Sequence, residues 1–246
     1  MEVYNPDEKQ NYKVQADGNL ATTLNLIKVY SFFAIGLLIT AGMIFGFQPL
    51  LKAIVNGFNI TTPYNQIYNG TLIGFLVALF IFGMMSSLSI MVNRAWFVGL
   101  SYFMYALCFG GAMSSLTNWL DTNVIGMAFG VSGAIFIVCG IIGVLTKGKL
   151  SKWANFLFML VLGSIVISIV NIFLRSSTLS WITSFVILLV FLFITAIDVD
   201  RVHRLASEKG FDNNNCLALY EAYCLYADFA VIFSYVIRII AASKNN

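Results

Sequence analysis

The chain has 246 residues, of which 59% are hydrophobic and only 10% are charged, and its formal net charge is +3 at pH 7. A soluble domain of this length carries far more charge, so the composition excludes a soluble globular protein and indicates an integral membrane protein. The small positive charge is spread along the chain and forms no basic patch of the kind that binds nucleic acid.

The first 23 residues mix acids, lysines and amides, without an apolar core followed by a small-residue cleavage site. They therefore do not have the pattern of a cleaved signal peptide. We expect residues 1–23 to form a loose cytoplasmic tail. Residues 24–246 contain no polar stretch long enough to fold separately, so we expect them to form a single transmembrane domain.

Seven segments follow the tail. A helix needs about 20 apolar residues to cross about 30 Å of hydrocarbon. Six runs meet this requirement: Val29–Phe47, Thr71–Met91, Trp96–Leu116, Val124–Leu145, Trp153–Leu174 and Leu179–Ile197. A seventh run, Cys216–Ala241, is interrupted by Glu221 and Asp228, and its length and its tyrosines favour a helix that is buried against the others. The sequence predicts an all-α integral membrane protein with seven transmembrane helices.

The basic residues indicate an orientation, because lysine and arginine are enriched in cytoplasmic connections. With a cytoplasmic N-terminus, ten of the fourteen basic residues lie inside, namely Lys9, Lys13, Lys28, Arg94, Lys147, Lys149, Lys152, Arg201, Arg204 and Lys209. Four lie outside, namely Lys52, Arg175, Arg238 and Lys244. We therefore expect a multi-pass protein of the cell membrane, with its N-terminus in the cytoplasm and its C-terminus outside.

Glycines recur along the fourth segment, at Gly126, Gly130, Gly133, Gly140 and Gly143. Small residues at this kind of spacing allow the backbones of membrane helices to approach closely. We expect this face of the fourth helix to pack closely against a neighbour.

Two aspartates adjoin or interrupt apolar sequence. Asp198 follows directly after the apolar run of the sixth segment, and Asp228 lies within the seventh. A charged side chain at the bilayer centre costs about 2.5 to 3.5 kcal/mol on insertion scales, so a chain that keeps one usually uses it. Antiparallel helices joined by a short loop around Gly210 to Asn214 would bring the two aspartates to similar depth.

Such a pair would respond to protons. Two carboxyl groups that share a low-dielectric site cannot both ionise cheaply, so a protonated pair is held together by a hydrogen bond. When both are charged, they repel each other and attract a cation, and carboxylate oxygens favour hard ions such as Ca²⁺. We expect Asp198 and Asp228 to act as a proton-sensitive latch that contacts calcium transiently, with calcium as a permeant ion and no cofactor.

Other interpretations of the charged residues stay open. Asp198 and Asp200 could belong to an exposed, charged helix end, and Asp228 could be a structural acid that a tyrosine or Arg94 satisfies. Glu221 lies on the same helix face as Asp228 and could line the cytoplasmic mouth. Arg94 could be only a topology signal, or it could pair with the acids. Arg94, Glu221 and Asp200 are therefore candidate partners at the gate or the pore mouth.

The stretches AIDVDRVHR and ALYEAYCLYADFAVIFSYVIRIIA resemble the last two transmembrane motifs of the Bax inhibitor-one family. The family has a Leu-Tyr-Leu-Asp-Phe-Ile-Asn-Leu-Phe pattern in its seventh helix, which LYADFAVIF matches closely, so Asp228 corresponds to the family's aspartate. AIDVD matches the sixth-helix motif only at Asp198, because Ile197 replaces the family's tyrosine. The family also has an arginine at the end of its second helix, a place that falls near Val92, and the nearest arginine is Arg94.

For bacterial members this resemblance implies a seven-helix bundle with a central helix, and a pH-sensitive calcium leak in which Asp198 and Asp228 act as the sensor. The first functional hypothesis is therefore a pH-gated calcium (cation) leak channel, whose partners are the lipid bilayer, calcium ions and protons. A second is a non-transporting membrane protein that modulates a membrane protease or a stress or cell-death response. A third is a proton-coupled transporter. No nucleophile with a histidine base or metal cluster is evident, so we do not expect an enzyme.

Overall fold

The structure is a computed structural model that describes residues 6–58, 60, 62–146, 148–208 and 215–244. In this part of the chain the helices are α1 (Pro6–Gly57), α2 (Tyr64–Val92), α3 (Ala95–Met113), η1 (Ser114–Asn118), α4 (Thr122–Thr146), η2 (Lys149–Trp153), α5 (Ala154–Leu174), α6 (Ser177–Glu208) and α7 (Cys216–Lys244). The two η elements are short 3₁₀ helices, whereas each α helix is long and apolar enough to cross a membrane. The predicted all-α fold with seven transmembrane helices is confirmed.

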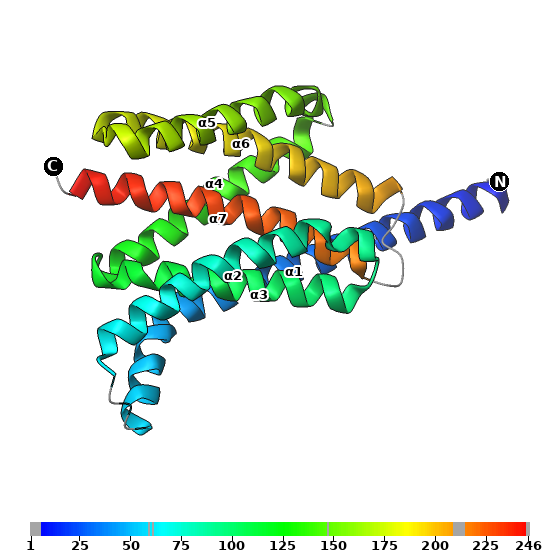
Figure 1. The fold of residues 1–246 in the computed structure, drawn as a ribbon. Coiled ribbons are helices and arrows are strands. Elements are labelled where there is room, and N and C mark those ends of the chain that lie inside the picture. Colours follow the sequence, from blue (N-terminus) through cyan, green and yellow to red (C-terminus); the bar gives the residue numbers. More distant parts are fainter. Residues whose placement is uncertain (1–5, 59, 61, 147, 209–214, 245–246) are drawn as a thin grey trace.

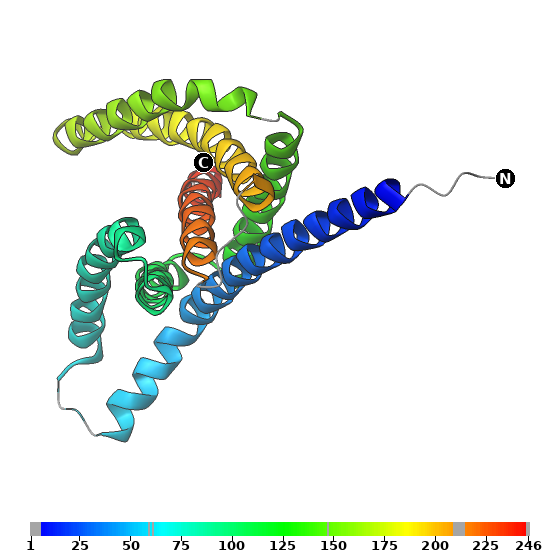
Figure 2. The ribbon, with the colours of Figure 1, turned by 90° about the vertical axis from the view of Figure 1, so that its right-hand side faces the viewer.

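Helix α1 begins earlier than we expected. The loose tail predicted for residues 1–23 is corrected for the described residues, because α1 runs without a break from Pro6. Proline is favourable at the first position of a helix, and the glutamate, lysines and glutamines that follow it have good helix propensity. Polar composition thus excluded burial of this segment but not helix formation. Figure 2 shows the N-terminal part of α1 extending away from the bundle.

Helix α7 occupies the centre of the bundle. It packs against α1, α2, α3, α4 and α6, and Figure 2 shows it enclosed by these helices, with α5 on the outer side of α6. Its largest fully buried side chains are Leu225, Tyr226, Phe229, Ile232 and Phe233. The seventh helix keeps two acidic side chains within its span, and its neighbours are largely protein and not lipid, so the prediction of a buried seventh helix is confirmed.

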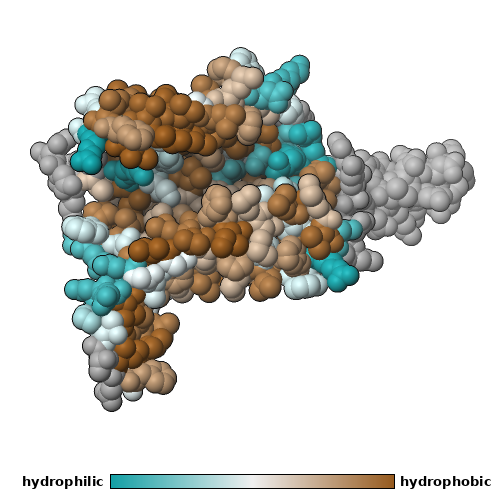
Figure 3. Space-filling model, in the orientation of Figure 1, coloured by the Kyte–Doolittle hydropathy of each residue, from teal (hydrophilic) through white to brown (hydrophobic). Residues whose placement is uncertain are grey.

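The outer helices present apolar side chains to their surroundings. Ile73 and Phe80 of α2 and Phe158 and Ile172 of α5 are all well exposed. Figure 3 shows hydrophobic residues over the sides of the molecule, with hydrophilic residues gathered toward its two ends. This distribution is the reverse of a soluble protein's and fits a multi-pass membrane protein.

Only part of the glycine face of α4 packs closely. A Cβ atom at Gly126, Gly130 or Gly133 would meet no other atom within 4 Å, so the expected close packing is wrong for these three. A Cβ at Gly143 would overlap the backbone carbonyl oxygen of Ala196 on α6. The close crossing of α4 and α6 is therefore confined to the end of α4 nearest the α4–α5 connection.

The connections between the helices lie at two opposite ends of the bundle (Figure 1). We call the end with the α2–α3, α4–α5 and α6–α7 connections the N-side, because α1 enters there, and the opposite end the C-side. The connection that we expected around Gly210 to Asn214 lies outside the described residues, as do Lys147 and Lys209. Helices α6 and α7 nevertheless run antiparallel and in contact, so their N-side halves face each other (Figure 1).

Candidate functional site: an acid cluster between α6 and α7

Four charged side chains meet at the interface of α6 and α7. Asp198 and Arg201 are three residues apart on α6, and Glu221 and Asp228 are seven residues apart on α7. Both spacings place the two side chains on one face of their helix. Because the two helices pack together, these faces meet, and we call the four residues the acid cluster.

The deeper part of the acid cluster is a pair of carboxyl groups. The side chains of Asp198 and Asp228 lie against each other, as the sequence pattern suggested that they could. Asp228 is only 5% exposed, whereas the side chain of Asp198 is 16% exposed. The structure thus brings both predicted sensor residues to one depth and leaves Asp198 as the one nearer to solvent.

One oxygen of Asp228 is not satisfied. Its Oδ2 atom is buried and has no hydrogen-bond partner in the described part of the chain. The hydroxyl group of Thr195 lies beside this carboxyl group, but it donates to the carbonyl oxygen of Phe191 over 2.7 Å. Buried carboxylate oxygens are normally paired, so this atom is a place for a proton, a water molecule or a cation.

The shallower part of the acid cluster is centred on Arg201. Its Nη1 atom lies 3.2 Å from Oδ1 of Asp198. Its Nη2 and Nε atoms donate to Oε2 of Glu221 over 3.0 and 3.2 Å. The Glu221 side chain is 3% exposed and that of Arg201 is 38% exposed. A single guanidinium group therefore bridges the two helices and partly balances two of the three carboxyl groups.

Sequence reasoning missed Arg201, which it treated only as a topology residue. Two signals could have identified it. Arg201 lies three residues after Asp198 on the same helix, a spacing at which opposite charges meet. In addition, a glutamate on a buried helix such as α7 requires a cation from a neighbouring helix, and α6 is the neighbour that supplies one.

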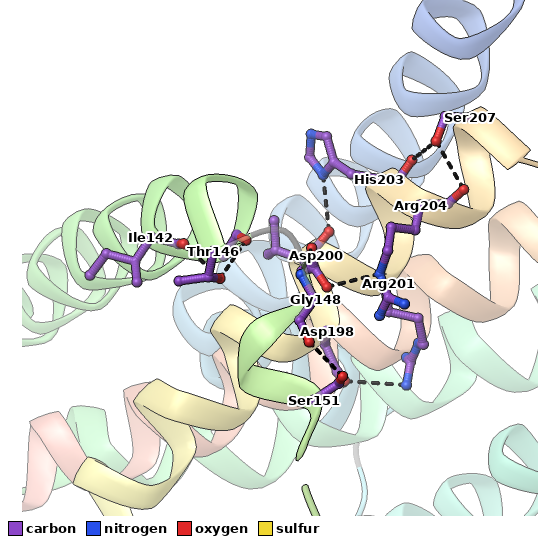
Figure 4. A network of polar contacts seen from close by, with 12 residues as sticks. Ile142, Thr146, Gly148, Ser151, Asp198, Asp200, Arg201, His203, Arg204 and Ser207 are labelled. Carbon is purple, nitrogen blue, oxygen red and sulfur yellow. Dashed lines mark hydrogen bonds and ion pairs between the residues drawn. The ribbon is translucent and has the colours of Figure 1, made fainter. Parts of the chain in front are cut away.

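Asp200 belongs to a different cluster. Its Oδ2 atom accepts a hydrogen bond from Nε of Arg204 over 2.9 Å, and its Oδ1 atom accepts one from the backbone N–H of Gly148 over 3.0 Å. Figure 4 shows this group at the connection between α4 and η2. The structure therefore places Asp200 where it holds the α4–α5 connection against α6, and does not bring it to the Asp198–Asp228 pair.

Arg94 is also separate from the acids. It occupies the N-cap position of α3 in an extended conformation, and it is exposed. The ion pairs found among the described residues join Arg201 to Asp198 and Glu221, and Arg204 to Asp200. Arg201 thus occupies the place beside the acids that the family resemblance suggested for Arg94.

Aromatic rings pack close to Asp228 along α7. Tyr226 lies two residues before Asp228 and Phe229 directly follows it, and both are fully buried. The hydroxyl group of Tyr226 hydrogen-bonds to that of Thr40 on α1, and the ring packs edge-on against Tyr102 of α3. Phe229 packs against Phe136 of α4. The partly exposed Arg201 thus lies on the N-side of the carboxyl pair, whereas the ring of Phe229 follows Asp228 toward the C-side.

In the described ranges no group of three or more histidine, cysteine, aspartate or glutamate side chains is arranged to hold a metal ion. Arg201 also places a positive charge beside the carboxyl pair. The acid cluster therefore combines three carboxyl groups with one guanidinium group.

Comparison with known proteins identifies the family. The model of the family described as inhibitor of apoptosis-promoting Bax1 matches residues 23–246. An uncharacterized protein of Borreliella burgdorferi is 28% identical over 225 residues, which cover 90% of this chain and 93% of the relative. The inner membrane protein YbhL of Escherichia coli is 27% identical over 217 residues, covering 87% of this chain and 89% of the relative. An uncharacterized protein of Deinococcus radiodurans is 29% identical over 216 residues. The chain is a multi-pass membrane protein that belongs to the Bax inhibitor-1 family.

Proposed function

We propose that the protein is a pH-sensitive cation leak channel that conducts calcium and is gated by Asp198 and Asp228. The observation that carries this proposal is the carboxyl pair itself. Two acids lie in contact inside a membrane-spanning bundle, and one oxygen of Asp228 is buried without a partner. A buried acid pair whose partly exposed member lies beside a more exposed cation is suited to sensing protons and admitting a cation.

The gating step follows from the charges on the pair. With one proton between them, the two carboxyl groups attract each other and keep α6 and α7 together. When that proton leaves, two negative charges about 4 Å apart repel each other by about 4 kcal/mol at an effective dielectric constant of about 20. Conformational equilibria commonly differ by only a few kcal/mol, so a repulsion of this size is enough to shift a closed bundle toward an open one.

Calcium fits the deprotonated pair. Ca²⁺ takes oxygen ligands in flexible geometry, and two carboxylates supply oxygens together with negative charge. A site with only two acidic side chains, one of them shared with Arg201, would hold the ion weakly. Weak binding is what conduction requires, because the ion must leave as readily as it enters.

The test is calcium flux into liposomes that contain only this protein and enclose a calcium-sensitive dye. We expect entry of calcium that changes with pH between about pH 6 and 8, the range to which a coupled buried pair can move its upper titration. Protein-free liposomes are the control. Flux that persists after an ionophore has dissipated the proton gradient argues against a proton-coupled transporter. Absence of flux at every pH would instead favour a non-transporting interaction protein.

The orientation is a separate prediction. The basic residues favour a cytoplasmic N-terminus, and seven crossings then put the C-terminus outside. The relative YbhL is named an inner membrane protein, which supports the same location here. Reporter fusions at each end, one type active only in the cytoplasm and one only outside, should give opposite signals. The same signal from both ends would show that this topology is wrong.

A further inference from the structure

The gating step proposed above involves Asp198 and Asp228, and it does not include the ion pair between Arg201 and Glu221. It joins α6 to α7, and the Glu221 carboxyl group is almost fully buried. Burying a carboxylate costs several kcal/mol unless a cation and hydrogen bonds compensate for it. Two hydrogen bonds from one guanidinium group to Oε2 supply that compensation. The ion pair between Arg201 and Glu221 is therefore a specific contact between α6 and α7 and differs from an ion pair between two exposed side chains.

The ion pair between Arg201 and Glu221 lies nearer to the N-side than the carboxyl pair does. Glu221 lies seven residues before Asp228, which places it about 10 Å nearer to the N-side along α7. Arg201 lies about one turn to the N-side of Asp198 on α6. The guanidinium group consequently lies between the carboxyl pair and the N-side end of the bundle.

The guanidinium group of Arg201 is shared between Glu221 and Asp198. Two of its nitrogen atoms bind Glu221, and a third lies beside Asp198. Glu221 and the carboxyl pair thus compete for a single positive charge. The more strongly Glu221 holds the guanidinium group, the less charge remains to stabilise Asp198 and Asp228 in their ionised form.

We propose that Arg201 and Glu221 form a gate on the N-side of the carboxyl pair, in which Glu221 anchors the guanidinium group and so sets the pH at which the pair loses its proton. This inference rests on the proposed function, because it concerns the regulation of the same site. It assigns Glu221 as a positioning residue that acts through Arg201.

Arg201 and Glu221 are the main charged groups beside the carboxyl pair. Among the described residues, the other titratable groups that face the cluster are Tyr220 and Cys224 on α7 and Cys139 on α4. Thiols and phenols have ordinary pKa values of about 8.5 and 10, so these three are mainly neutral between about pH 6 and 8. The charges that determine the protonation of the pair are therefore those of Arg201 and Glu221.

Two substitutions should shift the protonation midpoint in opposite directions. Glu221→Gln removes a negative charge and frees Arg201 for Asp198, so the midpoint should fall. Arg201→Gln removes the positive charge, so the midpoint should rise. A unit charge about 6 Å away at an effective dielectric constant of about 20 corresponds to a shift of about two pH units, and we expect at least about one.

The midpoint can be measured without relying on transport. The purified protein in lipid nanodiscs, with isotope-labelled aspartate carboxyl groups, gives an infrared band for protonated aspartate that can be followed against pH. Calcium flux in liposomes provides the second readout. The double variant Arg201→Gln with Glu221→Gln carries no net charge change, so its midpoint should return close to that of the unchanged protein. This recovery also guards against misfolding of either single variant.

Arg204→Gln is the matched control, since Arg204 lies three residues further along α6 but pairs with Asp200. It should leave the midpoint unchanged, as should Arg94→Gln. The gate is overturned if neither single variant moves the midpoint while Asp228→Asn removes the infrared titration, and the proposed function then stands. It is also overturned if both variants move the midpoint in the same direction. Opposite shifts in a protein that passes no calcium at any pH would support the coupling and overturn the proposed function.

Discussion

Asp228→Asn is expected to flatten the pH dependence of calcium flux between about pH 6 and 8. Asp228 is almost fully buried, and its Oδ2 atom has no partner in the described part of the chain. Asparagine keeps the shape of the side chain but cannot release a proton, so the two negative charges that drive opening can no longer form. Flux measured in liposomes across this pH range tests the expectation.

Asp198→Asn should have a smaller effect of the same kind. The Asp198 side chain is partly exposed and already lies beside Arg201, so its ionisation is supported by water and by a cation. Asp121→Asn, at the exposed α3–α4 connection on the C-side, is the control and should leave the pH profile unchanged. An unaltered pH profile in both Asp228→Asn and Asp198→Asn would exclude the carboxyl pair as the sensor.

Gly143→Leu is expected to give the largest loss of stability. A Cβ atom at this position would overlap the carbonyl oxygen of Ala196, which belongs to the backbone of α6 and cannot move aside as a side chain can. Overpacking of this kind typically costs about 1 to 3 kcal/mol. Because Ala196 lies two residues before Asp198, separation of α4 from α6 should also disturb the acid cluster.

Gly133→Leu is the matched control on the same helix. A Cβ atom at Gly133 meets no other atom within 4 Å, so a leucine there is expected to be tolerated at an open position of α4. Thermal unfolding of both variants in the same detergent should show a clearly lower melting temperature for Gly143→Leu alone. Equal melting temperatures would mean that α4 and α6 do not pack as described.

The sequence by itself determined the number of spanning helices and the burial of the seventh. Each span is a local property, since about 20 apolar residues are needed wherever a helix crosses hydrocarbon. The interruption of the last span by Glu221 and Asp228 indicated burial for an equally local reason, because charged side chains avoid lipid. Asp228 could therefore be identified as a site residue before any neighbour was known.

Other features depended on the rotation and neighbours of each helix, which no local pattern gives. Asp198 and Asp200 are two residues apart, which is about 200° around a helix, and only packing against α7 decides which one faces Asp228. The glycines of α4 look equivalent in sequence, yet only the crossing point with α6 makes Gly143 indispensable.

The partner of the acids was decided in the same way. Arg94 and Arg201 are both basic residues near helix ends. The spacing of Arg201 from Asp198 indicates that they share a helix face, but it does not show that this face meets Glu221. The tertiary structure places Arg201 at the contact between α6 and α7 and leaves Arg94 exposed. An ion pair between helices depends on side chains that are distant in sequence and face each other only after the helices have packed.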